Sequence, residues 1–533
     1  MMHDWLAAQT MARPDGVALV IDDTTFTFRA LNERVAGFAA RLAAAGTQRG
    51  GVLGILLPNR LEAALAVYAA ARLGVTLALL NTRLTPAELD GQIARAACSL
   101  LVCDSETLGV ALELNGAPPM VCVDPVDRPP VIRLDQLPAD TVENYRAGTI
   151  TLDDPFAIMF TSGTSGTPRG ALLTYGAIFA SAMGSAYRIG VLPHDRWLCV
   201  LPLYHVGGVS ILLRSCLYGT AVDLWRRFEP DAILQRLYAA PVTLISLVPT
   251  MLYRLLERHD PATPPCALRL ALLGGAATPP DLAERAAHLG WPVATTYGLT
   301  EAASQVATAL PEDVRRKPGS VGKPLIFSQV RVVDESGRDQ APGMYGEIIV
   351  GGPTLMQGYL GDMPLERAPD GDAWFATGDI GYLDADGDLW VVQRRSDLII
   401  SGGENIYPSE IEQVVRAHPA VADAAVIGVP SPEWGQQVGA VLVLRDATVH
   451  IDDILAFCRT RLAGYKLPRI VRVVDELPRT ASGKLQRAGL RELLGEGETG
   501  RQGERGGGGD RERGRYGDKN NNAPRTGSLQ EGI

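Results

Sequence analysis

The sequence predicts an α/β protein with a large N-terminal part of parallel or mixed sheets covered by helices, an antiparallel β subdomain, and a small α+β C-terminal domain. Between Gly16 and about residue 300, short apolar runs such as "GVLGILL", "VTLALL" and "SLLVCD" alternate with helical patterns such as "LNERVAGFAARLAAAG". Near-continuous apolar strands separated by helices are typical of parallel sheets that are covered on both faces. From about residue 320 to 395, Gly/Asp turns separate short strands such as "GEIIVGG". This pattern favours antiparallel hairpins.

More than one domain is expected, because 533 residues exceed what a single hydrophobic core usually serves. We place a large domain at 1–395 and a small one at 396–494, where "EIEQVVRAH" and "AVLVLR" return to α+β character. The segment 495–533 is rich in Gly and charged residues and has few apolar ones, so it is expected to be disordered. Its RG steps would also suit nucleic-acid binding, but a solubilising tail is the simpler interpretation.

Composition and charge disfavour several classes of protein. The net charge of −10 gives no reason to expect a nucleic-acid surface. Seven Cys are scattered without a C-x-x-C pair, which indicates reduced thiols in a cytoplasmic protein. The N-terminus carries Asp4 and lacks an apolar segment of signal length, so a secretion signal is not expected. The most apolar stretch, 61–80, is interrupted by charges and predicts a buried helix and strand, so no membrane insertion is expected.

The stretch "TSGTSGTPRG" (161–170) is the first candidate for chemistry. Gly, Ser and Thr together are typical of a surface turn or linker. The alternative is a phosphate cradle, in which backbone N–H groups, hydroxyls and the Arg169 guanidinium surround anionic oxygens. The apolar runs "PFAIMF" and "GALLTY" on either side favour an ordered loop over a tether. The Gly-Lys-Ser/Thr ending of the Walker loop is absent, so the loop indicates a nucleotide without naming a fold.

Three later stretches are candidates for the rest of a nucleotide site. "TTYGLTE" (295–301) offers Tyr297 to stack on a base, with Thr300 and Glu301 toward phosphate and Mg²⁺, although an ordinary strand end would read the same way. In "ATGDIGYLDADGDLWVVQRRSD", Asp379 in a Gly-flanked turn would bind ribose and Arg394 a phosphate; two plain hairpin turns are the alternative. Lys484 in "LPRTASGKLQR" would reach the negative charge that develops on a carboxylate or an α-phosphate. The alternative is an ordinary lysine in an exposed loop.

Taken in order, the hydroxyl-rich loop, "LPLYHVGG", "LLGGA", "TTYGLTE", "TGD", "RRSDLIISGGENIYPSEIE" and "PRTASGK" resemble the acyl-adenylate-forming superfamily over about residues 5–490. Ser165 and Arg169 stand where that superfamily more often has Thr and Lys, and both keep the hydroxyl or the charge. The resemblance implies ATP contacts at Thr161, Ser162, Gly163, Thr164, Arg169, Gly274, Gly275, Ala276, Tyr297 and Asp379. It implies catalytic roles for Lys484, Arg394, Glu301, Thr300 and His205, and Mg²⁺ contacts at Glu301 and Thr161.

The chemistry of that superfamily has two steps. A carboxylate attacks the α-phosphorus of ATP and releases pyrophosphate, and the thiol of CoA then displaces AMP. ATP and CoA are thus the implied co-substrates, with Mg²⁺, and cations and N–H donors supply most of the catalysis. No side-chain nucleophile is needed, so no Cys is assigned a role. Lys484 belongs to the small domain, which in this superfamily rotates between the steps about a hinge that matches Ser396.

Stretches such as "ALLNTRLTPAEL" and "RRSDLIISGGENIYPSEIE" most resemble the branch whose members join CoA to the aromatic dicarboxylic acid o-succinylbenzoate in menaquinone biosynthesis. The resemblance implies a cation for the second carboxylate, and Arg214 is the first candidate and Arg227 the second. For Arg214 the alternative is an arginine that reaches solvent from a helix. His205 and Ser304 are further acyl-pocket candidates.

Other readings stay open. The chain would alternatively be another aryl- or medium/long-chain fatty-acyl-CoA ligase, or a non-catalytic nucleotide-binding relative. The presence of Lys484, Glu301, Asp379 and Arg394 disfavours the last. The expected partners are a small carboxylic acid, ATP and CoA. A homodimer is one possible assembly.

Overall fold

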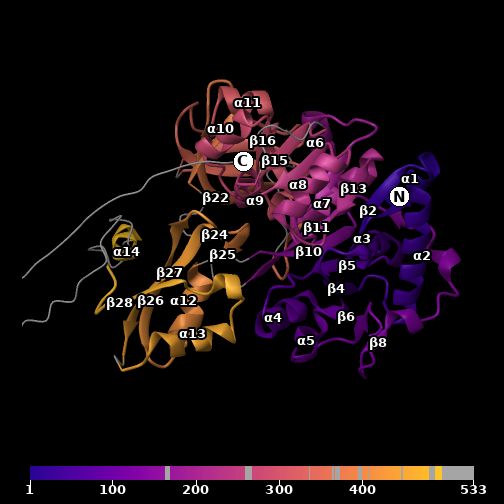
Figure 1. The fold of residues 1–533 in the computed structure, drawn as a ribbon, viewed down its shortest axis with the longest axis horizontal. Helices are drawn as coiled ribbons and strands as arrows, with labels where there is room; N and C mark the ends of the chain where they lie inside the picture. The colour runs from indigo at the N-terminus through magenta and orange to yellow at the C-terminus, as the bar shows by residue number, and fades with distance from the viewer. Residues whose placement is uncertain are drawn as a thin grey trace, which may run out of the picture.

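The fold is that of a computed structural model, which describes residues 1–161, 168–258, 267–334, 336–362, 365, 373–393, 399–406, 408–445, 448–478 and 487–494. The described chain forms a large region of two extensive sheets with their helices, an antiparallel sheet, and a small region that follows residue 398 (Figure 1). The α/β class predicted from the sequence is confirmed. The predicted domain boundary at residues 395 and 396 lies outside the described residues and stays a prediction.

The first large sheet is mainly parallel. Its order is β21 (Gly358–Tyr359), β11 (Arg169–Thr174), β10 (Pro155–Thr161), β5 (Thr76–Leu79), β4 (Val52–Leu56), β6 (Cys98–Cys103), β7 (Met120–Cys122) and β8 (Ile132–Arg133). Strand β11 is antiparallel to β10 and β21, and the other pairs are parallel. Thr161, the last residue of β10, is paired with Arg169, the first residue of β11. The two ends of the predicted phosphate loop are therefore held together by a sheet.

The second large sheet carries the edge on which the candidate site is built. Its order is β18 (Lys323–Pro324), β17 (Ser304–Ala309), β16 (Val293–Leu299), β15 (Leu270–Leu273), β14 (Leu244–Leu247), β12 (Arg196–Cys199), β13 (Ala221–Leu224), β2 (Val17–Ile21) and β3 (Thr24–Thr27). From β16 to β2 all pairs are parallel. The carboxyl ends of these strands consequently lie at one edge, where ligands of such sheets usually bind.

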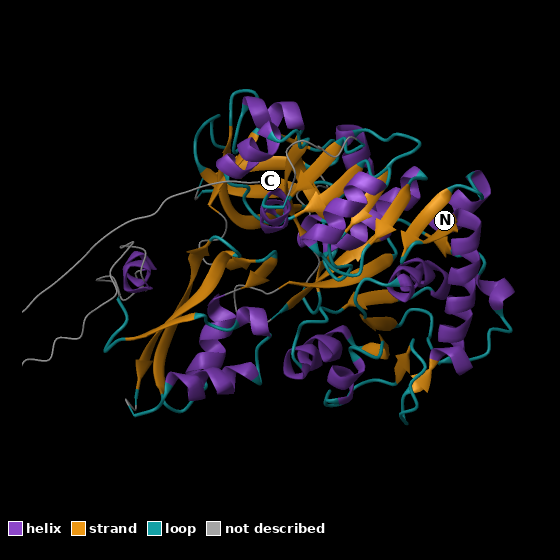
Figure 2. Cartoon of the chain, viewed as in Figure 1, coloured by secondary structure: helices purple, strands orange, loops and turns teal. Residues whose placement is uncertain are grey.

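Helices cover the faces of these sheets (Figure 2). The most deeply buried is α3 (Leu61–Leu73), which is apolar on all sides and ends at Gly74 in the left-handed conformation. Helix α4 (Pro86–Ala96) begins with Pro86 and a capping box between Thr85 and Glu88. The other helices of this region are α1 (Trp5–Ala12), α2 (Phe28–Ala44), α5 (Leu108–Leu112), α6 (Tyr175–Ile189), α7 (Val206–Tyr218), α8 (Pro230–Ala239), α9 (Pro249–Leu256), α10 (Pro280–His288) and α11 (Pro311–Arg316).

One hydrophobic core joins the two large sheets. It contains Leu53 and Leu77 of the first sheet, Leu19 and Trp197 of the second, and apolar side chains of α2, α3, α6 and α7. The short pair β1 (Met2–His3) and β9 (Thr149–Ile150) lies beside it. Because both sheets share this core, the strand ends that carry the candidate site are held as one rigid frame.

The predicted antiparallel β subdomain is present. It is the sheet β19 (Gln329–Val333), β20 (Gly346–Gly351), β22 (Trp374–Leu383) and β23 (Leu389–Gln393), in that order and antiparallel throughout. The turn between β22 and β23 carries Asp384, Asp386 and Asp388, whose oxygens lie close enough together to hold a metal ion. The Lys317 ammonium occupies this cluster instead, at 2.6, 2.8 and 2.6 Å from the three carboxylates.

The small region is a sheet with helices on both faces. It contains β24 (Ile399–Ser401), β25 (Glu404–Ile406), β26 (Val421–Ser431), β27 (Gly435–Leu444) and β28 (Ile470–Val473), with α12 (Pro408–Arg416), α13 (Ile451–Arg459) and α14 (Arg487–Leu494). Ala424 and Val426 pack with residues of α12 and α13, whereas Ala425 and Ile427 pack with Leu490 and Leu494 of α14. This alternation is the period of a strand that is buried on both sides. In Figure 1, α14 lies at the end of the small region away from the large one.

Within the described part of the chain, no helix has both the length and the apolar character that crossing a membrane requires.

Candidate active site

A cavity of about 680 Å³ opens at the carboxyl edge of the second large sheet. Several of its lining residues directly follow parallel strands: Leu201 comes after β12, Val248 after β14, and Gly274 and Gly275 after β15. The end of β16 adds Gly298, the turn after it adds Thr300, and the start of β17 adds Ser304. The cavity is thus a product of the sheet topology, because each strand delivers its last residues to the same edge.

The small region closes one side of this cavity with the turn between β24 and β25. Gly402 and Gly403 have φ angles of 58° and 88°, which only glycine adopts readily. A Cβ on Gly403 would lie 3.1 Å from the Val248 side chain, so the turn approaches the wall of the large region closely. Gly402, Gly403 and Glu404 all line the cavity.

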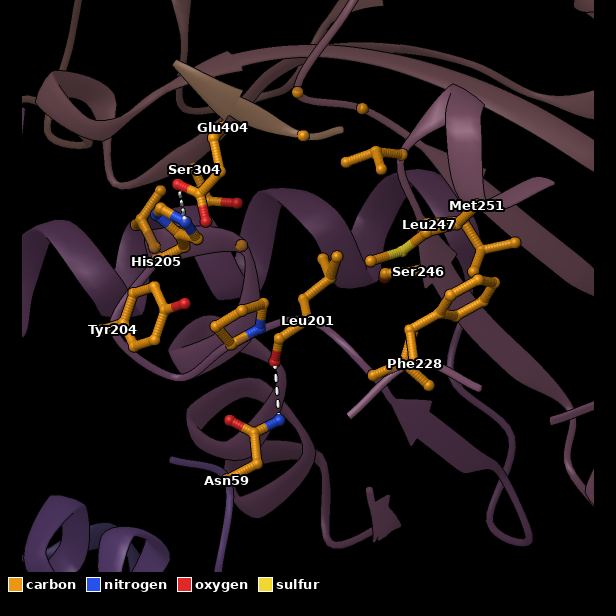
Figure 3. A pocket seen from close by; sticks show the side chains of 18 of the residues that line it. Asn59, Leu201, Tyr204, His205, Phe228, Ser246, Leu247, Met251, Ser304 and Glu404 are labelled. Carbon is orange, nitrogen blue, oxygen red and sulfur yellow. Dashed lines mark hydrogen bonds and ion pairs between the residues drawn. The ribbon is translucent and has the colours of Figure 1, made fainter. Parts of the chain in front are cut away.

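His205 of the large region and Glu404 of the small region contact each other where both line the cavity (Figure 3). His205 Nε2 lies 3.2 Å from Glu404 Oε2, and Arg83 Nη1 lies 3.0 Å from Glu404 Oε1. Burial alone would raise the pKa of the Glu404 carboxyl, but the charges of His205 and Arg83 outweigh it and hold the pKa below its ordinary value. The carboxylate is therefore ionised and fixes the imidazole at the point where it lines the cavity.

Arg214 lines the cavity from α7 and is buried, with 2% of its surface exposed. The sequence alternative of an arginine that reaches solvent is therefore wrong. Its guanidinium donates to Gln305 Oε1 at 2.7 Å, Ser210 Oγ at 3.0 Å and Ser304 Oγ at 3.5 Å, all neutral groups. Burial lowers the pKa of the guanidinium. A buried cation without a carboxylate among its described contacts is costly, and it suits an anion that arrives with a ligand.

Glu301 and Arg169 are joined through Tyr359. The Tyr359 hydroxyl donates to Glu301 Oε1 at 2.6 Å, and the Arg169 guanidinium lies 3.5 Å from the centre of the same ring and pairs with Asp362. Glu301 is 8% exposed and is the middle residue of the turn Thr300–Ala302, directly after β16. A fixed carboxylate beside hydroxyl groups is the kind of oxygen donor that Mg²⁺ takes, so these residues fit the expected ion.

Tyr297 and Asp379 contact each other, but Asp379 lies in a different element from the one that we predicted. Tyr297 lies within β16, which runs on to Leu299, and its hydroxyl donates to Asp379 Oδ2 at 2.5 Å. Asp379 lies within β22 and not in a turn. The Gly378 that precedes it has a φ of 73°, and the pairing with β20 shifts register nearby. The Gly pattern marks an irregularity inside a strand.

The remaining predicted residues divide between the cavity, its surroundings and the undescribed segments. Thr300, Ser304, Gly274 and Gly275 line the cavity, and Ala276 follows them, half-buried. Arg227 also lines it, but its side chain is 77% exposed and pairs with Glu229 at 2.9 Å. Thr161 ends β10, and its hydroxyl donates to the Arg169 carbonyl at 3.4 Å. Outside the described residues lie Ser162, Gly163, Thr164, Arg394, Ser396 and Lys484.

Sequence reasoning missed three residues of this arrangement. Glu404 stands inside the quoted motif "SGGENIYP" and was given no role, although a carboxylate after two glycines is a usable signal. Tyr359 and Gln305 carry no local signal, because their contacts with Glu301 and Arg214 appear only when distant strands meet.

Residues 6–360 match the model of the AMP-binding enzyme family, and residues 410–484 match that of the AMP-binding enzyme C-terminal domain. The chain belongs to the AMP-binding enzyme family. It is 42% identical to the 2-succinylbenzoate–CoA ligase of Bacillus licheniformis, over 91% of this chain and 98% of that protein. The resemblance to acyl-adenylate-forming enzymes is confirmed.

This AMP-binding family member also resembles solved structures of the o-succinylbenzoate CoA synthetase of Bacillus subtilis, at 37% identity. A double mutant of that enzyme bound to its product analogue has a TM-score of 0.82, covering 93% of this chain and 99% of that chain. The complex with the acyl-adenylate intermediate has a TM-score of 0.68, covering 94% and 100%. The complex with ATP and magnesium has a TM-score of 0.66, covering 92% and 99%.

Proposed function

We propose that this protein is an ATP-dependent acid–CoA ligase of menaquinone biosynthesis that converts o-succinylbenzoate to its CoA thioester through an acyl-adenylate. The observation that carries the choice of acid is Arg214, a buried cation at the cavity with neutral partners among the described residues. A dicarboxylate brings one carboxylate for activation and a second that pairs with this guanidinium. The identity with 2-succinylbenzoate–CoA ligases over nearly the whole chain supports the same acid.

The first half-reaction places the acid, ATP and Mg²⁺ in one site. We assign the phosphates to the loop between Thr161 and Arg169, the ribose to Asp379, and the ion to Glu301. Mg²⁺, when bound, offsets the negative charge that gathers on the phosphates. Tyr359 holds the Glu301 carboxylate in place, and Tyr297 does the same for Asp379. The chain supplies orientation and positive charge, and the carboxylate of the acid is itself the nucleophile.

The second half-reaction is the one that the described arrangement serves best. Gly402, Gly403 and Glu404 of the small region line the cavity beside His205, where the thiol of CoA would meet the acyl-adenylate. The higher TM-score with the product-analogue complex of the Bacillus subtilis enzyme, compared with its acyl-adenylate complex, supports this assignment. We therefore take this arrangement as the thioester-forming one.

Adenylation requires a different arrangement in this proposal. Lys484 is the proposed adenylation residue, and it precedes α14 in the chain by three residues. Helix α14 packs on the face of the small sheet opposite α12 and α13 and lies away from the large region (Figure 1). A rotation of the small region about Ser396 would bring the lysine to the phosphates.

Two finer points stay predictions. The cytoplasmic location inferred from scattered Cys is supported by six described cysteines that are all free thiols. A homodimeric assembly is the second.

The substrate is tested by incubating the protein with ATP, Mg²⁺, CoA and one acid at a time. o-Succinylbenzoate should give AMP, pyrophosphate and a thioester, and benzoate and octanoate should react at least ~10-fold more slowly because they leave Arg214 unpaired. If octanoate or benzoate is faster, the protein is another aryl- or fatty-acyl-CoA ligase. If no acid releases pyrophosphate, it is a non-catalytic relative.

A further inference from the structure

A buried three-membered ionic cluster joins the small region to the large one. Lys466, in the single turn Gly464–Lys466, has 3% of its surface exposed. Its ammonium lies 2.6 Å from Glu88 Oε1 of α4 and 2.8 Å from Glu410 Oε1 of α12. Glu410 and Lys466 both belong to the small region, whereas Glu88 belongs to the large one. In Figure 1, α4 and α12 lie on facing sides of the two regions.

The two oxygens of Glu88 do different things. Oε2 accepts hydrogen bonds from the Thr85 backbone N–H at 2.9 Å and from the Thr85 hydroxyl at 2.8 Å, which caps the start of α4. Oε1 is the oxygen that Lys466 contacts. The capping bonds fix the side chain, so Oε1 is already oriented toward the small region before that region arrives.

In a neighbouring ion pair the signs are reversed, with the cation on the large region and the anion on the small one. The two pairs together permit only one relative position of the two regions. Arg83, just before α4, pairs with Glu404 and lies 4.6 Å from the centre of the Tyr465 ring. The segment 83–88 therefore presents a cation to Glu404 and an anion to Lys466. A shifted position that set Arg83 against Lys466, or Glu88 against Glu404, would oppose like charges.

The Lys466–Glu410 pair is complete within the small region, so Glu88 adds an interaction that exists only when the regions are docked. The contact is removed from water, where a charge-assisted hydrogen bond is strongest. Docking at this point also places Gly402, Gly403 and Glu404 against the cavity.

Building on the proposed function, we propose that Glu88 is a positioning residue for the thioester-forming half-reaction: by accepting the buried Lys466 ammonium, it holds the small region where it completes the CoA side of the cavity. Glu88 touches no substrate. Its effect is on how often the thioester-forming arrangement is present, and it has no part in adenylation.

The test measures both half-reactions in the wild type, Glu88→Gln, Lys466→Gln and the double variant. Adenylation is followed as ATP–pyrophosphate exchange with o-succinylbenzoate, and thioester formation is followed from supplied o-succinylbenzoyl-adenylate and CoA. Glu88→Gln should raise KM for CoA about 10-fold or more, because it loses a charge-assisted hydrogen bond between the two regions. The rate of adenylation should stay within about twofold of the wild type. Glutamine still accepts from Thr85, so α4 keeps its cap.

The double variant should be no worse than Lys466→Gln alone, because both side chains act through one contact. Asp90→Asn is the matched control: it removes one charge from the same helix, where Asp90 bonds only Asn115 in the described chain, and it should change neither step. An unchanged thioester step in Glu88→Gln, an equal loss in both steps, or additive effects would each overturn the inference. Failure of the wild type with every acid would instead refute the proposed function.

Discussion

At the scale of the residue, burial decides what the charged groups of the cavity do. Arg214 was ambiguous in the sequence, because an arginine on an apolar helix either reaches solvent or stays inside. The structure buries it beside Gln305 and Ser304. Ser304 and the preceding Ala303 have φ angles of 102° and 51°, an unusual backbone for residues other than glycine. Such strain is often retained where a side chain must be aimed at a ligand.

Replacing Arg214 tests its role in choosing the acid. Arg214→Gln should lower kcat/KM for o-succinylbenzoate by about 10- to 100-fold, the range for a lost charge-assisted hydrogen bond. The kcat/KM for benzoate should change by no more than about twofold, because benzoate has no second carboxylate to lose a partner. Steady-state pyrophosphate release with each acid provides the measurement. Equal losses for both acids would show that Arg214 supports the fold of the cavity and does not select the substrate.

At the scale of the element, the strands were largely predictable and their irregularities were not. The apolar runs that form β4, β5, β6 and β10 predicted buried strands, because short, nearly continuous apolar segments are typical of strands that are covered on both faces. Asp379 was placed in a turn because Gly378 looks like a turn residue, whereas β22 continues through a bulge there. Contacts such as His205 with Glu404 depend on how distant elements meet, and no local pattern carries that information.

The contact of β16 with β17 yields a prediction about Gly298. A Cβ at this position would lie 1.9 Å from the Ser304 carbonyl oxygen, so Gly298→Ala must push the strands apart at the cavity. It should destabilise the protein by roughly 1–3 kcal/mol or more and reduce turnover. Gly37→Ala is the control, because a Cβ there meets no atom within 4 Å and the position is inside α2. Thermal unfolding of both variants decides: a melting temperature for Gly298→Ala equal to that of the wild type would contradict the strand geometry.

At the scale of the whole molecule, the cavity is shared between two regions. The ends of the second large sheet supply much of its wall, and segments that follow β4, β5 and β6 of the first sheet add Asn59, Arg83 and Glu106. The turn at Gly402 and Gly403 adds the contribution of the small region. The order of motifs predicted this shared site through family resemblance. The particular docking surface of α4 with Lys466 had no signal in the sequence, because it depends on the relative position of two folded units.

The tail after the small region is expected to play no part in this assembly. Deleting residues 495–533 should leave the melting temperature and the turnover nearly unchanged, since the segment has few apolar residues with which to pack. Comparing calorimetry and steady-state rates of the full and shortened chains is sufficient. A large loss of either would mean that the tail docks on the enzyme.

The central claim is that one cavity performs two reactions in two arrangements of the chain, and Lys484→Ala tests it most directly. Adenylation of o-succinylbenzoate by this variant should fall ~100-fold or more, because the cation that meets the developing charge is gone. Thioester formation from supplied o-succinylbenzoyl-adenylate and CoA should stay near the wild-type rate, because the proposal assigns the lysine to adenylation alone. Equal damage to both half-reactions would contradict the account.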